Sequence, residues 1–329
     1  MIVRREFITL LGGAAAWPLA AGAQQGDRIR RIGLLMNVTA DHPDATPRLA
    51  AFRDTLRELG WVEGRNVSIE VRWGGADFGL YRRYAAELVA LAPDVLVTAS
   101  GLIAVELQRV TRSVPIVAAV MNDPLTLGYI DSLAKPGGNM TGFARIEYSF
   151  SAKWLELLKE IAPNVERAAI LRDTNRNGDH QFTEIKAAAP SLKVNEVNSI
   201  GMVDADQIER DVAEFASRLN GGLVLTAGTL STNYSHLIIA LAAKHRLPAV
   251  YPNSSHVARG GLVSYGPSVT NEYKRAAGYV DRILHGDKPA DLPVQRAVLY
   301  ETVLNLKTAA ALGLKVPSII MLRADEVIE

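Results

Sequence analysis

The stretches DVLVTASG at residues 94–101 and GGLVLTAGT at residues 221–229 resemble each other closely and decide the fold. Each is a short apolar run of strand length that ends in small residues. Such a run, bounded by turn residues, is typical of a strand buried on both faces of a parallel sheet. The repeat therefore predicts two α/β units within the 329 residues of the chain.

The segments around these two strands also correspond, in the same order. In the first half, strand and helix patterns alternate over residues 30–37, 49–60, 66–73, 80–93, 94–100, 103–112 and 114–120. In the second half, the order returns over residues 167–174, 182–190, 192–200, 204–220, 221–229 and 235–252. Strands separated by helices favour a parallel sheet covered on both faces. We expect an α/β fold with two similar, doubly wound parallel-sheet lobes; one continuous sheet is the alternative.

Ligands of such sheets bind beyond the carboxyl ends of the strands, where helix N-termini present backbone N–H groups. This rule selects loops 36–39, 99–101 and 121–124 in the first half. In the second half it selects loops 172–175, 227–229 and 251–253. If the lobes face each other, these loops line one cleft.

Residues 1–23 have the pattern of an export signal. Arg4 and Arg5 form a twin arginine, a short apolar run follows, and Ala21-Gly22-Ala23 resembles a cleavage site. Glycines and a proline interrupt the apolar run, which makes it a poor membrane-spanning helix. We expect a periplasmic protein without a lipid anchor, exported by the twin-arginine route; a buried N-terminal helix is the alternative.

Composition and motifs give no support for an enzyme. The chain has no cysteine, which excludes thiol catalysis and thiolate metal sites. No phosphate-binding loop or nucleophile elbow occurs, and the six histidines lack the spacing of metal ligands. The net charge of +1, with both signs interspersed, argues against a nucleic-acid partner. The sequence predicts no catalytic residue, no metal and no cofactor.

Several segments together resemble one family, the periplasmic solute-binding proteins of ABC transporters with the type I fold. Within it, the chain is similar to the group that includes tryptophan- and tyrosine-binding components. The similarity lies in AFRDTLRELGWVEGRNVSIEVRW (51–73), AAELVALAPDVLV (85–97), NDPLTLGYIDSLAKPGGNMTGF (122–143), KWLELLKEIAP (153–163), LAAKHRLPAVYP (241–252), GGLVSYGPS (260–268), YVDRILHGDKPADLPVQ (279–295) and NLKTAAALGL (305–314).

The resemblance implies a multi-segment hinge and a transport function. Three crossings are expected, just after residue 143, near 253–256 and near 292–296. The lobes would then comprise residues 28–146 with 257–293, and residues 147–256 with 294–329. The protein would be a monomer that captures a small solute, such as an aromatic or other amino acid or a small carboxylate, and delivers it to a membrane permease and its ATPase.

The resemblance also places site residues on the selected loops. From the first lobe it implies Met36, Asn37, Ser100, Gly101, Asn122 and Asp123; from the second, Asp173, Thr174, Gly228, Thr229 and Asn253; near the hinge, Tyr265 and Gly266. Helix N-termini after Ser100 and Gly228 would favour an anionic end, and Asp173 or Asp123 would hold an ammonium group. Leu102, Met36 and Tyr265 would flank an apolar body. Capping roles for Ser100 and Thr229, and a turn at Asp123, are the alternatives.

The chain departs from the family pattern at two places. Gly101-Leu102-Ile103 follow Ser100 where hydroxylated residues or proline are usual, and Leu125-Thr126-Leu127 are bulkier than usual. Both changes weaken the expectation of an amino-acid ligand. Two other functions stay open: a sensory module with the same fold and, with less support, an exported α/β hydrolase.

Overall fold

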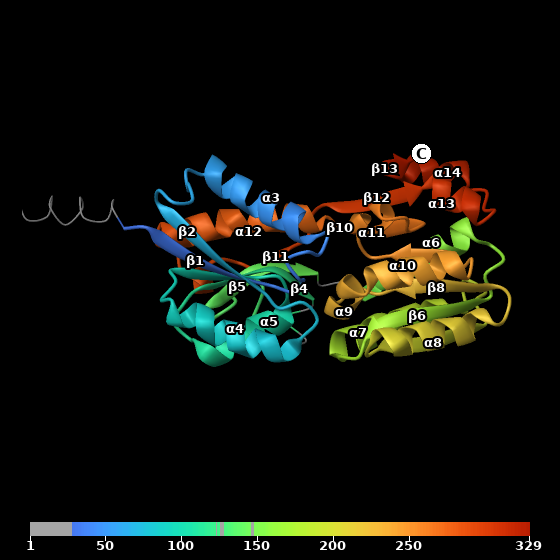
Figure 1. Cartoon of the computed structure of the whole chain (residues 1–329), viewed down its shortest axis with the longest axis horizontal. Coiled ribbons are helices and arrows are strands. Elements are labelled where there is room, and N and C mark those ends of the chain that lie inside the picture. Colours follow the sequence, from blue (N-terminus) through green and yellow to red (C-terminus); the bar gives the residue numbers. More distant parts are fainter. Residues whose placement is uncertain (1–27, 123, 126–127, 146–147) are drawn as a thin grey trace, which may run out of the picture.

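The computed structural model describes residues 28–122, 124–125, 128–145 and 148–329, and these form two α/β lobes side by side (Figure 1). Each lobe is built on its own sheet. The expected α/β class with two similar, parallel-sheet lobes is confirmed.

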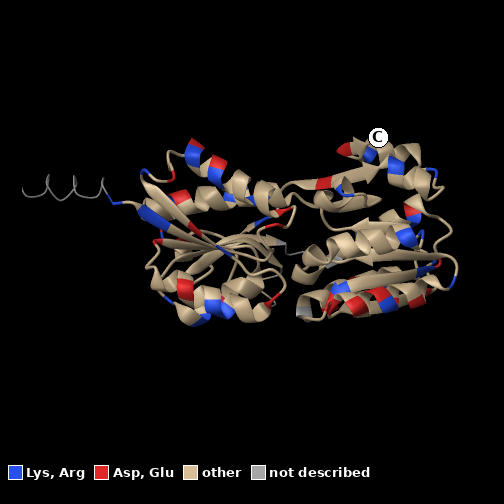
Figure 2. Ribbon diagram, in the orientation of Figure 1, with Lys and Arg blue, Asp and Glu red and all other residues tan. Residues whose placement is uncertain are grey.

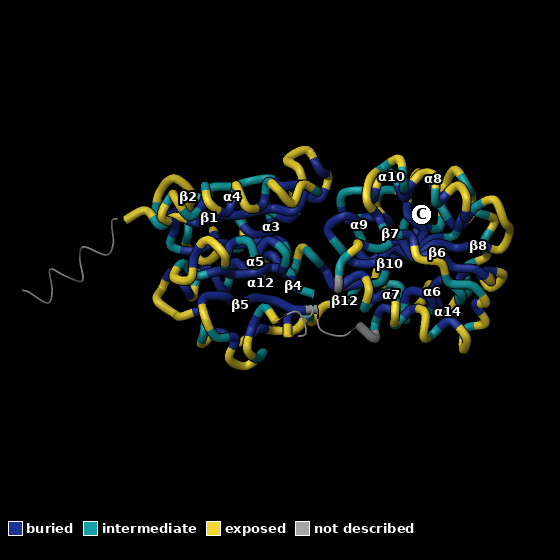
Figure 3. Tube along the Cα trace, turned by 90° about the horizontal axis from the view of Figure 1, so that it is seen from below, coloured by how far each residue is buried: buried dark blue, intermediate teal, exposed yellow. Residues whose placement is uncertain are grey.

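The sheet of the first lobe has the strand order β11-β5-β4-β3-β1-β2 over the described residues, and all its pairs are parallel. Its strands are β1 (Arg30–Met36), β2 (Val67–Trp73), β3 (Val95–Thr98), β4 (Ile116–Asn122), β5 (Met140–Arg145) and β11 (Gln295–Arg296). Apolar clusters lie on both faces, so the sheet lies between two helical layers (Figure 1). These layers are α3 (Ala45–Glu58) with α12 (Val269–Leu284), and α4 (Phe78–Ala90) with α5 (Gly101–Val110). Exposed residues are found mainly on the outside of the lobe (Figure 3).

The sheet of the second lobe has the order β13-β12-β10-β9-β8-β6-β7, in which only the β10–β12 pair is antiparallel among the described strands. The strands are β6 (Arg167–Asp173), β7 (Glu196–Met202), β8 (Gly221–Leu225), β9 (Ala249–Tyr251), β10 (Val263–Pro267), β12 (Tyr300–Asn305) and β13 (Glu326–Ile328). The helices are α6 (Ala152–Ile161), α7 (Arg176–Ala188), α8 (Ala205–Ala216), α9 (Thr229–Asn233), α10 (Ser235–Lys244), α11 (Ser254–Ala258), α13 (Leu306–Ala311) and α14 (Ser318–Arg323), with 3-10 turns η1 (Tyr148–Ser151) and, in the first lobe, η2 (Pro289–Asp291).

The chain passes between the lobes at three places: between β5 and η1, between β10 and α12, and between β11 and β12. The middle crossing differs from the expectation that residue 257 begins the return to the first lobe. Because β10 pairs with β9 and β12, residues up to Pro267 belong to the second sheet. The third crossing likewise follows Arg296, since β11 pairs with β5.

Lys and Arg are interspersed with Asp and Glu on the outer helices of both lobes (Figure 2). Within the described ranges, no helix combines the length and the apolar character needed to cross a bilayer.

Candidate functional site

The strand-end loops of the two lobes meet at a cleft with two adjoining cavities, of about 60 and about 100 Å³. Both cavities are lined by the same central residues: Ser100, Gly101, Asn122, Gly228 and Thr229. The first three come from the carboxyl ends of β3 and β4, and the last two follow β8. The structure thus brings together five of the residues that the sequence selected.

The first-lobe wall is the beginning of α5. Ser100 is the N-cap residue, and its Oγ accepts a hydrogen bond from the Ile103 N–H at 3.4 Å. The Tyr129 ring lies so close to Gly101 that a Cβ on this glycine would come within 2.5 Å of it. Leu102 and Tyr129 both line the larger cavity, which therefore has an apolar side next to a helix N-terminus.

Asp173 lines the larger of the two cleft cavities, and the structure also gives it partners within its own lobe. The buried carboxylate accepts hydrogen bonds from the N–H groups of Thr229, Leu230 and Ser231, at 2.8, 3.2 and 3.2 Å. Gly228 allows this approach, since a Cβ there would lie 2.3 Å from Asp173 Oδ1. Burial raises the pKa of Asp173, against the lowering effect of the hydrogen bonds. Asp173 thus caps α9 and occupies the helix N-terminus that we expected to hold the anionic end of a solute.

We expect Asp173→Asn to lower the free energy of unfolding by about 1–3 kcal/mol. The substitution replaces one acceptor oxygen by an NH₂ group, which cannot accept hydrogen bonds from the backbone N–H groups that it faces. Denaturant unfolding of the ligand-free protein measures this loss. Thr174→Ala, next to it and exposed, is the matched control and should have little effect. An unchanged midpoint for Asp173→Asn would contradict the capping role.

The other predicted residues differ in where the structure places them. Asn37 and Asn253 line the smaller cavity. Met36 is fully buried, with the Tyr273 hydroxyl 3.4 Å from its sulfur, and Thr174 is exposed. Tyr265 and Gly266 lie on β10 and line neither cavity of the cleft. The Tyr265 carbonyl accepts from Trp154 Nε1, and the Tyr265 ring stacks on Tyr300. Asp123 is outside the described residues.

Sequence reasoning missed several residues that line the cleft: Arg48, Val120, Asn177, Thr232, Val269, Tyr129 and Tyr273. Arg48 is the most informative, because a buried arginine requires partners. It lies on the buried face of α3, together with Ala45 and Phe52. An arginine three or four residues from apolar residues of the buried face could have indicated this position, but the helix predicted from the sequence began at residue 49 and left Arg48 out.

Charged and polar groups join the lobes beside the smaller cavity. Asp44, before α3, accepts from Arg48 Nη2 in its own lobe and from Arg259 Nη1 in the other, both at 2.6 Å. Ser255 Oγ also donates to Asp44, at 3.2 Å. Nearby, Asn233 Nδ2 donates to the Asn37 carbonyl at 2.8 Å. These contacts join the two lobes beside the cleft.

Burial and the two guanidinium groups together shift the pKa values of the neighbouring titratable groups. Burial alone would raise the pKa of Asp44, but the charges of Arg48 and Arg259 outweigh it and lower this pKa from 3.8 to about 2. Burial lowers the pKa of His256 from 6.5 to about 4, and Arg259 adds to this effect. Burial also lowers the pKa of His42, whose Nε2 donates to the Thr232 carbonyl at 3.2 Å. At neutral pH both histidines are therefore uncharged.

Comparison with known proteins decides the family. The family model described as "ABC transporter substrate binding protein" matches residues 34–328. This chain belongs to that family. A tyrosine-binding protein of Clostridioides difficile is 22% identical over 287 residues, which are 87% of this chain and 81% of the relative.

Solved structures agree on the fold of this substrate-binding protein. A Streptococcus pneumoniae ABC domain in complex with L-Trp has a TM-score of 0.82 and 24% identity, over 91% of this chain and 99% of that one. A ligand-free, open substrate-binding protein with adhesive properties from Clostridium difficile has a TM-score of 0.66 and 21% identity, over 92% and 99%. Members of this family bind solutes for ABC transporters and typically act outside the cytoplasm.

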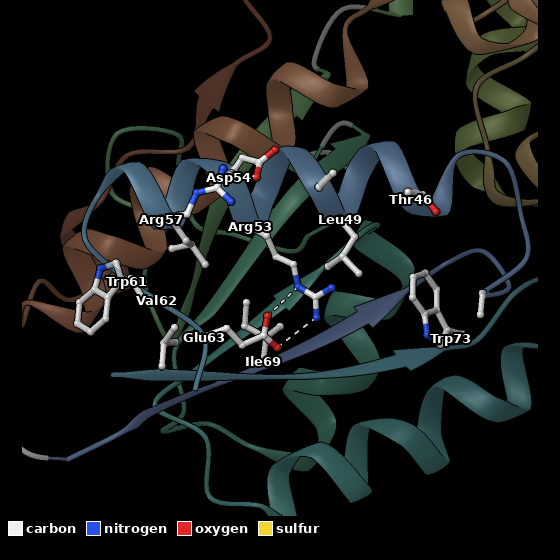
Figure 4. A pocket seen from close by; sticks show the side chains of 14 residues that line it. Thr46, Leu49, Arg53, Asp54, Arg57, Trp61, Val62, Glu63, Ile69 and Trp73 are labelled. Carbon is white, nitrogen blue, oxygen red and sulfur yellow. Dashed lines mark hydrogen bonds and ion pairs between the residues drawn. The ribbon is translucent and has the colours of Figure 1, made fainter. Parts of the chain in front are cut away.

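A third cavity, the outer cavity, has a volume of about 530 Å³ and lies outside the cleft, on the first lobe between α3 and β2 (Figure 4). Trp61 and Trp73 stand at its two ends, and Arg53 pairs with Glu63 across it at 3.0 Å. Only one lobe lines it, so closure of the lobes cannot enclose a solute there. For a substrate-binding protein the smaller, two-lobed cleft is therefore the better site. No group of three or more His, Asp or Glu side chains among the described residues could hold a metal ion.

Proposed function

We propose that this substrate-binding protein captures an amino-acid-type solute in the cleft between its lobes and presents it to the permease of an ABC importer. The observation that carries the proposal is the composition of the cleft. Polar residues from both lobes, among them Asn37, Asn122 and Thr229, surround a space beside Leu102 and Tyr129. Polar groups fix a polar end, and apolar side chains accommodate an aliphatic or aromatic body. The tyrosine-binding relative and the L-Trp complex support the same class.

Screening by thermal shift tests this function. L-tryptophan or L-tyrosine should raise the melting temperature of the purified protein, because a solute bound only by the folded state stabilises it. Small-angle scattering should show a smaller radius with the solute than without it, since only closure lets both lobes contact it. D-arabinose, a sugar, is the matched negative control. A shift with the sugar and none with any amino acid would contradict the proposed solute class.

We also propose that the protein is exported by the twin-arginine route, is not lipid-anchored and acts as a monomer. Arg4-Arg5 and the absence of cysteine support the first two points, and the two-lobed cleft built from one chain supports the third. Replacing both arginines by lysine should leave the precursor in the cytoplasm. Fractionation that finds the double variant in the periplasm at the normal level would contradict this route.

A further inference from the structure

Asn177 lines the cleft cavity of about 100 Å³ and carries a buried hydrogen-bond acceptor that has no protein partner. Asn177 is 8% exposed, and its Nδ2 donates to the Ala227 carbonyl at 2.9 Å. Its Oδ1 has no partner among the described protein atoms. Because the Ala227 carbonyl can only accept, Nδ2 must face it, which fixes the orientation of the amide. A buried acceptor without a partner is unfavourable and calls for a donor.

The smaller cavity is lined by a buried cation at the other end of the cleft. Arg48 is 6% exposed and lies beside Asn37 and Tyr273, which line the same cavity. Its Nη2 is paired with Asp44, whereas its Nη1 has a long contact of 3.5 Å with Asn37 Oδ1. The guanidinium thus combines one strong ion pair with a weakly engaged nitrogen near the cavity.

The charges around Arg48 do not balance. Asp44 is a single carboxylate shared by Arg48 and Arg259, and the neighbouring His42 and His256 are neutral. The group of Asp44, Arg48 and Arg259 therefore carries one excess positive charge in a buried place. A buried charge needs a counter-ion, and an arginine binds a carboxylate well. The N-terminus of α5 lines the same cavity and favours an anion as well.

We propose that the cleft recognises its solute at two poles from opposite lobes: Arg48 binds a carboxylate, and Asn177 Oδ1 accepts a hydrogen bond from a remote N–H or O–H group. This inference rests on the proposed function and specifies its substrate class. The two poles lie in different cavities, and Leu102 and Tyr129 line the space next to Asn177. The donor therefore belongs to the far end of the solute, such as the phenol of tyrosine or the indole of tryptophan.

Calorimetry with three probes tests the two poles separately. Wild type should bind L-tyrosine at least about tenfold more tightly than L-phenylalanine, which lacks the phenol, and than tyramine, which lacks the carboxylate. Asn177→Leu should remove the preference for tyrosine over phenylalanine and leave the preference over tyramine. Arg48→Met should remove the preference over tyramine and leave that over phenylalanine.

The variants should fold. Asp44 keeps Arg259 as its partner in Arg48→Met, and Ala227 O keeps Gln181 Nε2 at 3.0 Å in Asn177→Leu. Arg48→Lys retains the charge and should keep part of the preference over tyramine. Arg53→Met, on the same helix and paired with Glu63 outside the cleft, is the matched control and should bind like wild type.

Equal losses for all probes in Arg48→Met or Asn177→Leu would overturn the two-pole assignment, because a structural role does not discriminate among them. If wild type binds no amino acid, the proposed amino-acid class fails, and 3-(4-hydroxyphenyl)propionate then tests the poles. Binding of this carboxylate that weakens in both variants would support the assignment. Its failure to bind wild type would overturn it.

Discussion

Arg259→Met should weaken solute binding by about 30-fold or more, because it removes the ion pair that joins the lobes. Arg259 and Asp44 are nearly buried, with side-chain exposures of 12% and 5%, and their atoms approach to 2.6 Å. Truncating one partner of a buried, hydrogen-bonded charge pair costs about 2–5 kcal/mol. In an open protein, Asp44 still pairs with Arg48 and gains water. The loss of free energy therefore destabilises mainly the closed state, which binds the solute. Since each tenfold change in affinity corresponds to about 1.4 kcal/mol, a loss of about 2 kcal/mol lowers the affinity about 30-fold.

Titration calorimetry with the solute found by thermal shift gives the affinity, and scattering gives the fraction of closed protein. Arg218→Met is the matched control, since Arg218 pairs with Glu196 on the surface of the same lobe and is 63% exposed. Exposed pairs contribute about 0–1 kcal/mol, so this variant should bind and close like wild type. A wild-type affinity for Arg259→Met would show that the ion pair does not hold the closed state.

The fold was readable from the sequence because its strands are buried on both faces. Residues 95–97 and 223–225, at the centres of the two repeated stretches, are wholly apolar. The middle crossing was less readable. Residues 263–267 have the same composition whichever sheet they join, and only their pairing with β9 and β12 assigns them.

The site was readable as a set of loops but not as a set of roles. The rule of strand ends located Ser100, Asn122 and Thr229, yet it treats every acid at a strand end as a ligand contact. Asp173 is such an acid, and three backbone N–H groups of α9 use its carboxylate. Arg48 and Asn177 reach the cleft from within helices. Their contribution depends on how helices and loops pack, which sequence spacing does not specify.

The protein should also lose stability as the pH falls from 6.5 to about 4, because His256 is buried in its neutral form. Its Nδ1 donates to the Asn253 carbonyl at 3.0 Å, whereas its buried Nε2 has no partner among the described atoms. Protonation would place a charge on Nε2 near Arg259 and Arg48, with Asp44 as the opposing charge. The pKa of His256 is therefore lowered in the folded state, from 6.5 to about 4.

The sign follows from proton binding. Below pH 6.5, His256 becomes protonated in the unfolded chain, whereas in the folded protein it stays neutral down to about pH 4. Acidification therefore favours unfolding between these two pH values. The difference corresponds to roughly 3 kcal/mol, fully present above pH 6.5 and lost at about pH 4. Asp44 adds a further loss of stability below this window, because its pKa is 3.8 in the unfolded chain and about 2 in the folded protein. His42, whose pKa is also lowered, adds a loss of the same sign.

Denaturant unfolding at pH 7 and pH 4.5 measures this loss as a difference, so a general effect of the substitution on stability cancels. His256→Asn keeps a donor for the Asn253 carbonyl but cannot titrate, and its loss between the two pH values should be smaller than that of wild type by about 2 kcal/mol or more. His236→Asn, at an exposed position, is the matched control and should behave like wild type. The same loss in His256→Asn as in wild type would assign the acid sensitivity to other groups, with His42 the next to replace.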